Sequence, residues 1–329
     1  ELTVVDEIIA EPSLDSADTR IPGADSIDAG AGADIIIADH GVIGQVAGTL
    51  RMTTTGMVNR IESSQVATGL SDTVQGGLGD DIILTGLGDD LINDAGGNNI
   101  IFGDHGLVNY VSADDDLSDI DVIVSIATTF GGADTITTEN GNDVILGGLG
   151  SDVISARTGT NVVFGDAGEI VAAVSDAPQI PGVPMTLSVL RTIDPTLGAL
   201  DTITTGDGGD IVFAGHGGDT VNTGHGDNLV VGDSGALTVG VGLANLGSLP
   251  LELLTLTTTD ITVGGADLII TGLGEDIILG GAAGDTIDTG AAGLLSGVDS
   301  ADVVLGDHGF INWINVADGS TDFAREIET

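Results

Sequence analysis

The stretch that decides the fold runs from Gly76 to Gly106. It reads GGLGDDIIL (76–84), TGLGDDLIN (85–93), DAGGNNIIF (94–102) and GDHG (103–106). Units of nine residues follow one another without a gap, with glycine at the fourth position, an acid or asparagine at the sixth and an aliphatic residue at the eighth. A short fixed period of this kind predicts a parallel β-solenoid, in which each unit supplies one turn and one short strand.

Each position of the unit has a physical reason. Early glycines permit the positive φ of a tight turn, and they leave backbone carbonyls uncovered where a hard cation can reach them. A carboxylate at the sixth position completes an all-oxygen ligand set, which calcium prefers. The last three residues form a short strand whose middle side chain points inward. No helix is expected, because apolar residues do not recur at three- to four-residue spacing.

The nonapeptides resemble the RTX repeats of secreted Gram-negative proteins, as in GGLGSDVIS at residues 147–155. The resemblance covers most of residues 20–310. It implies an all-β fold, a right-handed parallel β-roll with calcium between stacked turns, type I secretion, and an extracellular or cell-surface location in a Gram-negative bacterium. The family includes toxins, lipases, proteases, adhesins, ice-binding proteins and surface-layer proteins, so the resemblance fixes the fold more firmly than the function.

The composition agrees with a calcium-loaded solenoid outside the cell. The 329 residues include 54 glycines and 51 acids but only 6 basic residues, which gives a formal charge of −45. Such a charge opposes compaction unless cations offset it, and it argues against binding to nucleic acid, whose phosphates demand a basic surface. The chain has no cysteine, so calcium rather than disulfides is expected to stabilise it.

A second, longer period is marked by an Asp-x-Gly turn. The turn recurs at Asp39, Asp104, Asp166, Asp233 and Asp307, at spacings of 65, 62, 67 and 74 residues from one Asp number to the next. We expect one continuous solenoid over residues 1–329, with blocks of approximately 1–66 (a short first block), 67–128, 129–195, 196–261 and 262–329. The segment after each Asp-x-Gly turn is interpreted as an outgoing strand, a long loop and a return strand. Together with four nonapeptide strands, these two predict about three coils per block, with the long loops on one edge.

This register predicts which turns stack. The first, third and Asp-x-Gly turns of a block share one edge, so Asp72 is expected to stack on Asp90, and Asp90 on Asp104. On the other edge Asp81 is expected to stack on Asn99, beyond which only the long loop follows. A neutral asparagine would then end a column that has no further cation to neutralise. The alternative is that asparagine only tolerates the left-handed geometry of the turn.

The candidate calcium ligands are the sixth-position and Asp-x-Gly carboxylates, together with glycine carbonyls. The carboxylates belong to Asp25, Asp34, Asp39, Asp72, Asp81, Asp90, Asp104, Asp134, Asp143, Asp152, Asp166, Asp201, Asp210, Asp219, Asp233, Asp267, Asp276, Asp285, Asp302 and Asp307. The carbonyls lie near Gly77, Gly79, Gly86, Gly88, Gly148, Gly150, Gly206, Gly208, Gly215, Gly217, Gly272 and Gly274. The acidic run at residues 114–116 offers a further calcium site, although a solvated loop is the favoured interpretation.

The ends of the chain also fall inside the period. Residues 2–5 resemble residues 237–240, the strand after an Asp-x-Gly turn, and residues 325–328 align with the return strand at residues 191–194. No capping sequence is evident at either end, although solenoids normally need caps. This pattern predicts a segment of a longer repeat protein, or a chain whose ends meet those of other copies in a filament.

The sequence therefore predicts a non-enzymatic, calcium-dependent structural array outside the cell, serving as an adhesin stalk, matrix filament or surface-layer component. Its expected partners are calcium ions and other copies of itself or further repeats, with no nucleic acid and no membrane insertion. One alternative is a secretion and folding module of a larger enzyme or toxin. A second is an ice- or ligand-binding solenoid, which requires a flat and regular outer face.

Overall fold

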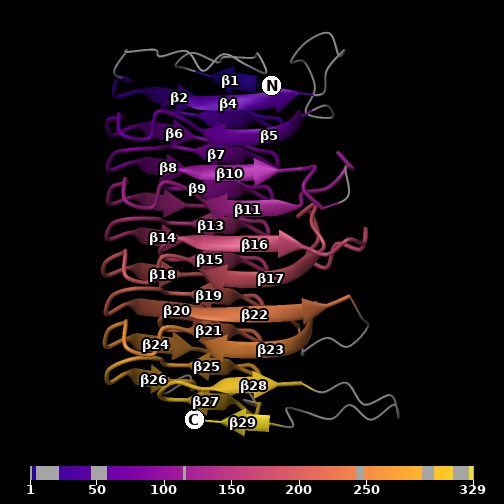
Figure 1. Cartoon of the computed structure of the whole chain (residues 1–329), viewed down its shortest axis with the longest axis vertical. Coiled ribbons are helices and arrows are strands. Elements are labelled where there is room, and N and C mark those ends of the chain that lie inside the picture. Colours follow the sequence, from indigo (N-terminus) through magenta and orange to yellow (C-terminus); the bar gives the residue numbers. More distant parts are fainter. Residues whose placement is uncertain are drawn as a thin grey trace.

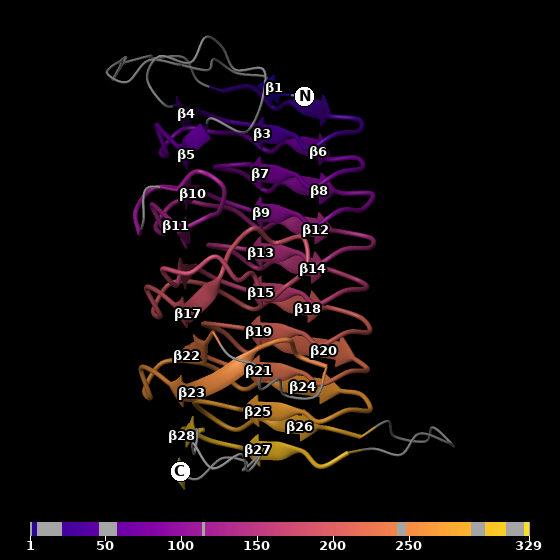
Figure 2. The same cartoon turned by 90° about the vertical axis from the view of Figure 1, so that its right-hand side faces the viewer.

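The computed structural model describes residues 2–4, 22–45, 58–113, 116–241, 248–290, 300–313 and 326–328. Within these residues every regular element is a β-strand, and the strands form three long sheets that lie side by side as layers (Figures 1 and 2). The all-β class and the parallel β-roll are therefore confirmed. No helix in the described part of the chain has the length and hydropathy needed to span a membrane.

Successive nonapeptide strands alternate between two parallel sheets. The outer sheet comprises β2 (Ser26–Asp28), β6 (Thr73–Gln75), β8 (Leu91–Asn93), β12 (Thr135–Thr137), β14 (Val153–Ser155), β18 (Thr202–Thr204), β20 (Thr220–Gly224), β24 (Leu268–Thr271) and β26 (Thr286–Asp288). The central sheet comprises β1 (Leu2–Val4), β3 (Ile35–Ile37), β7 (Ile82–Leu84), β9 (Ile100–Phe102), β13 (Val144–Leu146), β15 (Val162–Phe164), β19 (Ile211–Phe213), β21 (Leu229–Val231), β25 (Ile277–Leu279) and β27 (Val303–Leu305).

The segments after the Asp-x-Gly turns form a third, antiparallel layer, the hairpin sheet. It comprises β4 (Gly41–Gln45), β5 (Val58–Ser63), β10 (Gly106–Asn109), β11 (Val122–Ser125), β16 (Gly168–Ala172), β17 (Leu187–Thr192), β22 (Gly235–Gly240), β23 (Glu252–Thr258), β28 (Phe310–Asn312) and β29 (Glu326–Glu328). Within it, the outgoing strand of each block pairs with its own return strand and with the return strand of the block before.

The expectation of three coils per block is therefore wrong. A block such as residues 67–128 contributes two strands to each parallel sheet, which makes two coils, and its last two strands leave the roll as a hairpin. The resemblance of residues 2–5 to a post-turn strand was also misleading, because β1 pairs with β3 in the central sheet. By contrast, β29 pairs with β28 as the return strand that its sequence predicted.

Burial explains why the two kinds of nonapeptide strand differ in sequence. Outer strands such as Thr202–Thr204 bury only the middle residue, whereas central strands such as Ile211–Phe213 bury all three. The middle residues of both sheets form the core inside the roll, and the flanking residues of the central sheet form a second core against the hairpin sheet. A strand covered on both faces is apolar at every position, which is the pattern of the central sheet.

The Asp-x-Gly glycine lets a hairpin begin directly over the second core. A Cβ built on Gly106 would lie 2.4 Å from the ring of Phe102, and one on Gly168 would lie 2.5 Å from the ring of Phe164. The Phe164 ring in turn stacks on Phe213 of the next level, with ring centroids 4.9 Å apart. Only a glycine at this position allows the chain to turn so closely over these rings.

The turns gather on two edges of the roll. The acidic edge holds the turns that precede outer-sheet strands together with the Asp-x-Gly turns, and the mixed edge holds the turns that precede central-sheet strands. The described parts of two long loops reach the mixed edge, where Asn142 Nδ2 donates to the Pro181 carbonyl at 2.7 Å and Ser248 contacts Asp227. The predicted division of the turns between two edges is confirmed, and these two loops lie on the predicted edge.

Candidate metal centre

One column of turn residues consists entirely of aspartates. Each member lies immediately before an outer-sheet strand, and its backbone N–H donates to Oδ1 of the member one level further on, at 2.6 to 3.0 Å. This acidic column comprises Asp25, Asp72, Asp90, Asp134, Asp152, Asp201, Asp219, Asp267 and Asp285. Neighbouring carboxylates are therefore held about one strand spacing, roughly 4.8 Å, apart along the whole stack.

A second column, on the opposite edge, interleaves aspartate with asparagine. Its members precede the central-sheet strands and are linked by the same backbone N–H to Oδ1 bond, at 2.7 to 3.1 Å. This mixed column comprises Asp34, Asp81, Asn99, Asp143, Asn161, Asp210, Asn228, Asp276 and Asp302.

Two of the predicted contacts are confirmed and two are wrong. Asp72 stacks on Asp90 and Asp81 on Asn99, as expected. Asp90, however, is followed by Asp134 rather than by Asp104. Asn99 does not end its column, because Asp143 follows it. Both errors have one cause: since the hairpin leaves the roll, the first units of the next block stack directly on the last units of the block before.

The second carboxylate oxygen of the acidic column is the strongest local indication of a cation. Oδ2 is buried and has no hydrogen-bond partner in Asp134, Asp152, Asp201, Asp219, Asp267 and Asp285, and on the mixed edge the same is true of Asp81 and Asp276. A buried carboxylate oxygen without a donor is unfavourable. A row of such oxygens, one per level, suits divalent cations lying between levels, since calcium takes its ligands from carboxylates and carbonyls.

The Asp-x-Gly aspartates add carboxylates to this same edge. The Asp104 carboxylate accepts hydrogen bonds from the backbone N–H of Gly132, at 2.9 Å, and from that of Leu149, so this side chain is bonded to the next block. Asp233 is held in the same way by Gly265 and Ala282. Asp39 and Asp166 each accept from one later turn. Asp307 lies exposed at the C-terminal end of the described stack.

Glycines bring the carbonyls of one turn against the next. Gly150 has a φ of +146°, and a Cβ built on it would lie 1.8 Å from the Gly132 carbonyl oxygen. On the mixed edge, a Cβ on Gly141 would lie 1.6 Å from the Gly97 carbonyl oxygen. Of the predicted carbonyl donors, Gly86, Gly88, Gly148, Gly150, Gly215 and Gly217 lie on the acidic edge, and Gly77, Gly79, Gly206, Gly208, Gly272 and Gly274 on the mixed edge.

Burial and mutual repulsion make the calcium-free acidic edge electrostatically unfavourable. Burial, followed by the negative charge of Asp152, raises the pKa of Asp201 to about 9. Burial and the charges of Asp104 and Asp152 also raise the pKa of Asp134. On the mixed edge, burial raises the pKa of Asp143 only to about 6, because the Thr138 hydroxyl and Asn99 donate hydrogen bonds to it. Burial raises the pKa of Asp210 on the mixed edge to about 7, as it does that of Asp152 on the acidic edge, so only the largest rises are confined to the acidic edge.

The arginines that the structure describes do not supply positive charge to the acidic edge. Each arginine among the described residues is paired with a glutamate: Arg60 with Glu62, Arg157 with Glu139, and Arg191 with Glu169. Arg60 and Arg191 lie on the hairpin sheet, on the strands β5 and β17. Cations from solution are therefore the available counter-charge for the acidic column.

Comparison with protein families agrees with this geometry. A family model described as the RTX calcium-binding nonapeptide repeat (4 copies) matches residues 22–41, 66–101, 128–163, 201–236 and 261–292. These are RTX repeats. The matched ranges contain every member of the acidic column, and every member of the mixed column except Asp302. Comparison with curated proteins and with solved structures gives no match.

The residues present fit the calcium that RTX repeats bind. When bound, calcium supplies positive charge and oxygen coordination between turns. The carboxylates of the acidic column would hold it, with Asp39, Asp104, Asp166 and Asp233 beside them. The chain's own contribution is to fix the spacing of the carboxylates through their backbone N–H to Oδ1 bonds, and to leave Oδ2 without a protein donor.

Sequence reasoning missed a set of donors on the mixed edge. Thr138 Oγ1 donates to Asp143 Oδ2 at 2.6 Å, and Thr205 Oγ1 donates to Asp210 Oδ2 at 2.7 Å. The signal in the sequence is a threonine at the first position of the RTX unit. On the acidic edge this position is Gly147 in the unit of Asp152 and Ala214 in the unit of Asp219, but it is Thr85 in the unit of Asp90, so the threonine alone does not distinguish the edges.

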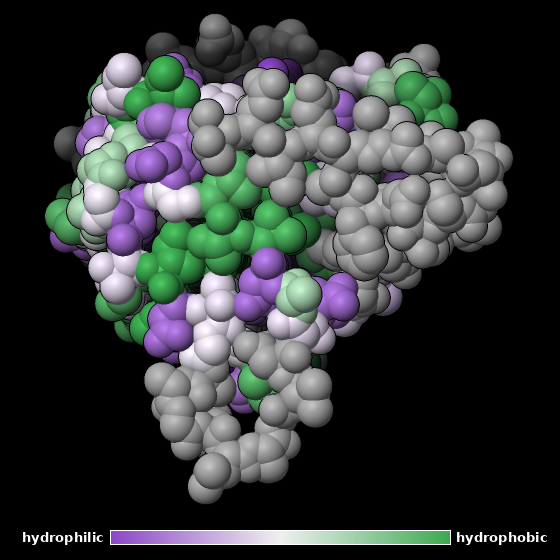
Figure 3. Space-filling model, turned by 90° about the horizontal axis from the view of Figure 1, so that it is seen from below, coloured by the Kyte–Doolittle hydropathy of each residue, from purple (hydrophilic) through white to green (hydrophobic). Residues whose placement is uncertain are grey.

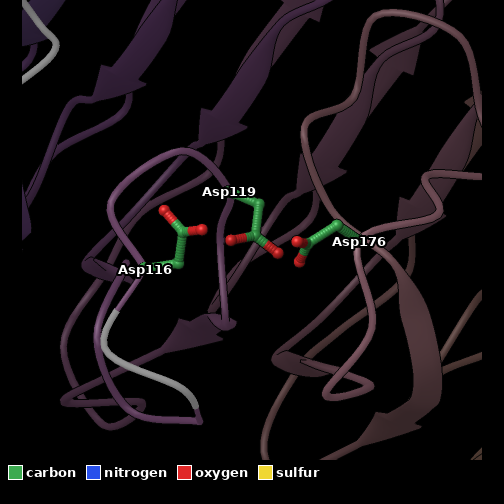
Figure 4. Close-up of side chains that lie close together, drawn as sticks. All are labelled: Asp116, Asp119 and Asp176. Carbon is green, nitrogen blue, oxygen red and sulfur yellow. The ribbon is translucent and has the colours of Figure 1, made fainter.

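A separate acidic group lies outside the roll. Asp116 and Asp119, from the loop between β10 and β11, approach Asp176, from the loop between β16 and β17, with one carboxylate oxygen of each within 4.8 Å of the others (Figure 4). Asp116 belongs to the acidic run singled out in the sequence, of which residues 114 and 115 lie outside the described residues.

Proposed function

We propose that this chain is a non-enzymatic, calcium-dependent structural array that folds outside the cell, as part of an adhesin stalk, a matrix filament or a surface layer. Proteins with RTX repeats are usually secreted, which supports the extracellular location. External calcium is of the order of millimolar, the range to which extracellular calcium modules are tuned. In its absence the carboxylates repel one another, and the glycine-rich, highly charged chain stays disordered.

The acidic column is the observation that carries this proposal. It runs through every level of the described outer sheet, from Asp25 to Asp285, without a neutral residue. An enzyme concentrates its perturbed carboxylates in one cleft, whereas here they are spread evenly along the long axis. Even spacing suits cross-linking of the whole stack, which is a structural task.

The end of the described stack supports association with further repeats or with another copy. Val304 of β27 is 43% exposed, although the residue at the same position of the preceding strand, Ile278, is fully buried. Seen from this end, apolar side chains form a patch bordered by polar ones (Figure 3). A further RTX coil would cover Val304 as β27 covers Ile278, so end-to-end stacking is the proposed mode of assembly.

The outer face of the outer sheet gives less support to ice or ligand binding. Its threonines, such as Thr135 and Thr202, are interrupted by the exposed side chains of Leu91, Val153 and Leu268. A regular ladder of hydroxyl groups is therefore broken at several levels, and the β-propensity of threonine accounts for those present.

The experiment is a calcium titration of the chelator-treated chain, followed by circular dichroism and small-angle scattering. The expected result is a disordered chain in chelator that becomes a β-rich rod at millimolar calcium, with magnesium as a control cation that does not replace it. Equal β-content and equal dimensions in chelator and in calcium would refute the proposal. Analytical ultracentrifugation of the calcium-loaded sample then tests end-to-end association.

A further inference from the structure

The two edges differ in what lies between successive carboxylates. In the mixed column, Asn99 Nδ2 donates to Asp143 Oδ1, Asn161 Nδ2 donates to Asp210 Oδ1, and Asn228 Nδ2 donates to Asp276 Oδ1, each at 3.0 Å. A carboxylate at the asparagine position would offer no such donor. Three levels of the mixed edge therefore carry an N–H group that points at the next carboxylate.

The same amides are satisfied on their other side. Asn99 Nδ2 also donates to Asp94 Oδ2 at 2.9 Å, and Asn228 Nδ2 donates to the Gly226 carbonyl at 2.9 Å. The amide oxygens accept the backbone N–H of the preceding column member, as a carboxylate would. Each asparagine thus keeps the register of the column through its amide oxygen, and its amide N–H donates to the next carboxylate where an aspartate could only accept.

Two of the three aspartates opposite these amides, Asp143 and Asp210, accept hydrogen bonds on both carboxylate oxygens, whereas Asp276 Oδ2 is buried without a hydrogen bond. In Asp143, Oδ1 accepts from the backbone N–H and Nδ2 of Asn99, and Oδ2 accepts from the Thr138 hydroxyl. Asp210 is bonded in the same way by Asn161 and Thr205. In the acidic column, by contrast, Asp152 and Asp219 each keep a buried Oδ2 that receives no hydrogen bond.

Charge alternation adds a second argument. From Asp81 to Asp276 no two successive members of the mixed column are both carboxylates, because an asparagine lies between each pair. An amide hydrogen facing a carboxylate occupies the direction from which a cation would be bound, and its partial positive charge repels the cation. Hydrogen bonding and cation binding are therefore exclusive at these levels.

We propose that the amides of Asn99 and Asn161 take the place of calcium at two levels of the mixed edge, so that these levels keep their register by hydrogen bonds while the acidic edge depends on the cation. This inference rests on the proposed calcium-dependent folding and specifies how the two edges share it. The chain consequently binds fewer calcium ions on the mixed edge than on the acidic edge.

The test is the calcium content of Asn161→Asp, measured in the full chain by equilibrium dialysis and atomic emission. The variant turns Asp143, residue 161 and Asp210 into three successive carboxylates, so its calcium content per chain should rise above that of the wild type, and its folding midpoint should move to higher calcium. Asn222→Asp is the matched control, because it adds the same charge on the exposed face of β20 and should leave the calcium content unchanged. An Asn161→Asp content equal to that of the wild type would overturn the inference.

A second measurement avoids dependence on how the variant folds. Anomalous scattering from wild-type crystals grown in calcium should place ions along the acidic column and none between Asn99 and Asp143 or between Asn161 and Asp210. Ions at those two levels would overturn the inference while leaving the proposed function intact. A wild-type chain that folds fully in chelator would instead contradict the proposed function.

Discussion

The acidic and mixed edges are built from the same nonapeptide and the same backbone hydrogen bonds, yet they neutralise their buried carboxylates differently. At Asp201 the second carboxylate oxygen is buried without a donor, whereas at Asp210 the corresponding oxygen accepts the Thr205 hydroxyl. The sequence difference that separates the columns is the amide in place of an acid at the sixth position, and at Asp143 and Asp210 a threonine hydroxyl adds a second donor. The solenoid backbone sets the spacing of the turns, and these two side chains decide whether a metal or a hydrogen bond fills it.

The largest expected effect on the acidic edge is a change in folding stability when calcium is removed and the pH is varied. Burial raises the folded-state pKa of Asp201 to about 9 and that of Asp267 to about 8, from an ordinary 3.8. The calcium-free folded chain therefore holds protons that the unfolded chain has released, so its stability is fully present below pH 3.8 and is lost as the pH rises toward 9. Each pKa unit corresponds to about 1.4 kcal/mol, and several carboxylates contribute.

Circular dichroism in chelator should thus show β-structure gained on acidification from neutral pH. With calcium present the dependence reverses, because protons then compete with the cation for the same oxygens. A calcium-free chain that becomes less ordered on acidification would contradict the account of the acidic edge.

Steric substitution should affect both edges alike, because it acts on the shared backbone. Gly150→Val on the acidic edge and Gly141→Val on the mixed edge each force a side chain onto a carbonyl 1.8 or 1.6 Å from the Cβ position. We expect each variant to lose about 3 kcal/mol or more of unfolding free energy, even in saturating calcium. Thermal melts in calcium measure this, and Gly284→Val, where a Cβ meets nothing within 4 Å, is the control. A large difference between the two edges would mean that the backbone is not their common frame.

Removal of one carboxylate should change the calcium response of the acidic edge more than that of the mixed edge. Asp201→Asn removes a ligand from the acidic column, so in calcium it should lose about 1 to 3 kcal/mol of stability, while in chelator it should gain stability by relieving repulsion from Asp152. Asp143→Asn should respond little to calcium, because Asp143 already receives protein donors on both oxygens. The measurement is the unfolding midpoint of each variant with and without calcium. The same calcium response in both variants would remove the distinction between the edges.

The roll and the two-edge arrangement could be predicted from the sequence, because a nine-residue period repeats the same turn at every level, and the candidate ligands lie on those two edges. What the sequence could not place was the hairpin. Counting strands made Leu107 and Ile123 part of a third coil, although they lie on antiparallel strands of a separate sheet. The uniform apolarity of Ile-Val-Phe at 211–213, against Thr-Ile-Thr at 202–204, was the available signal that one sheet is covered on both faces.

The asparagines show a second limit. Their position in the repeat was evident, but their partners were not, since Asn99 bonds to Asp143, 44 residues further along the chain. A nine-residue period does not predict that the intervening segment leaves the roll as a hairpin. These residues come together only because one block stacks on the next.

The smallest expected effect isolates a single hydroxyl. Thr205→Val removes the donor to Asp210 Oδ2 without changing the shape of the side chain greatly, and it leaves a buried carboxylate oxygen like those of the acidic edge. We expect the unfolding free energy to fall by about 1 to 3 kcal/mol in chelator-free, low-calcium buffer. The loss should be smaller at high calcium, because a calcium ion can then bind the Asp210 Oδ2 that has lost its donor. Thr204→Val is the control, because Thr204 points outward from the exposed face of β18 and should change stability by less than about 0.5 kcal/mol. If the Thr205→Val loss were independent of calcium, the hydroxyl would contribute only packing or hydrogen bonding, and threonine would not be what frees the mixed edge from the metal.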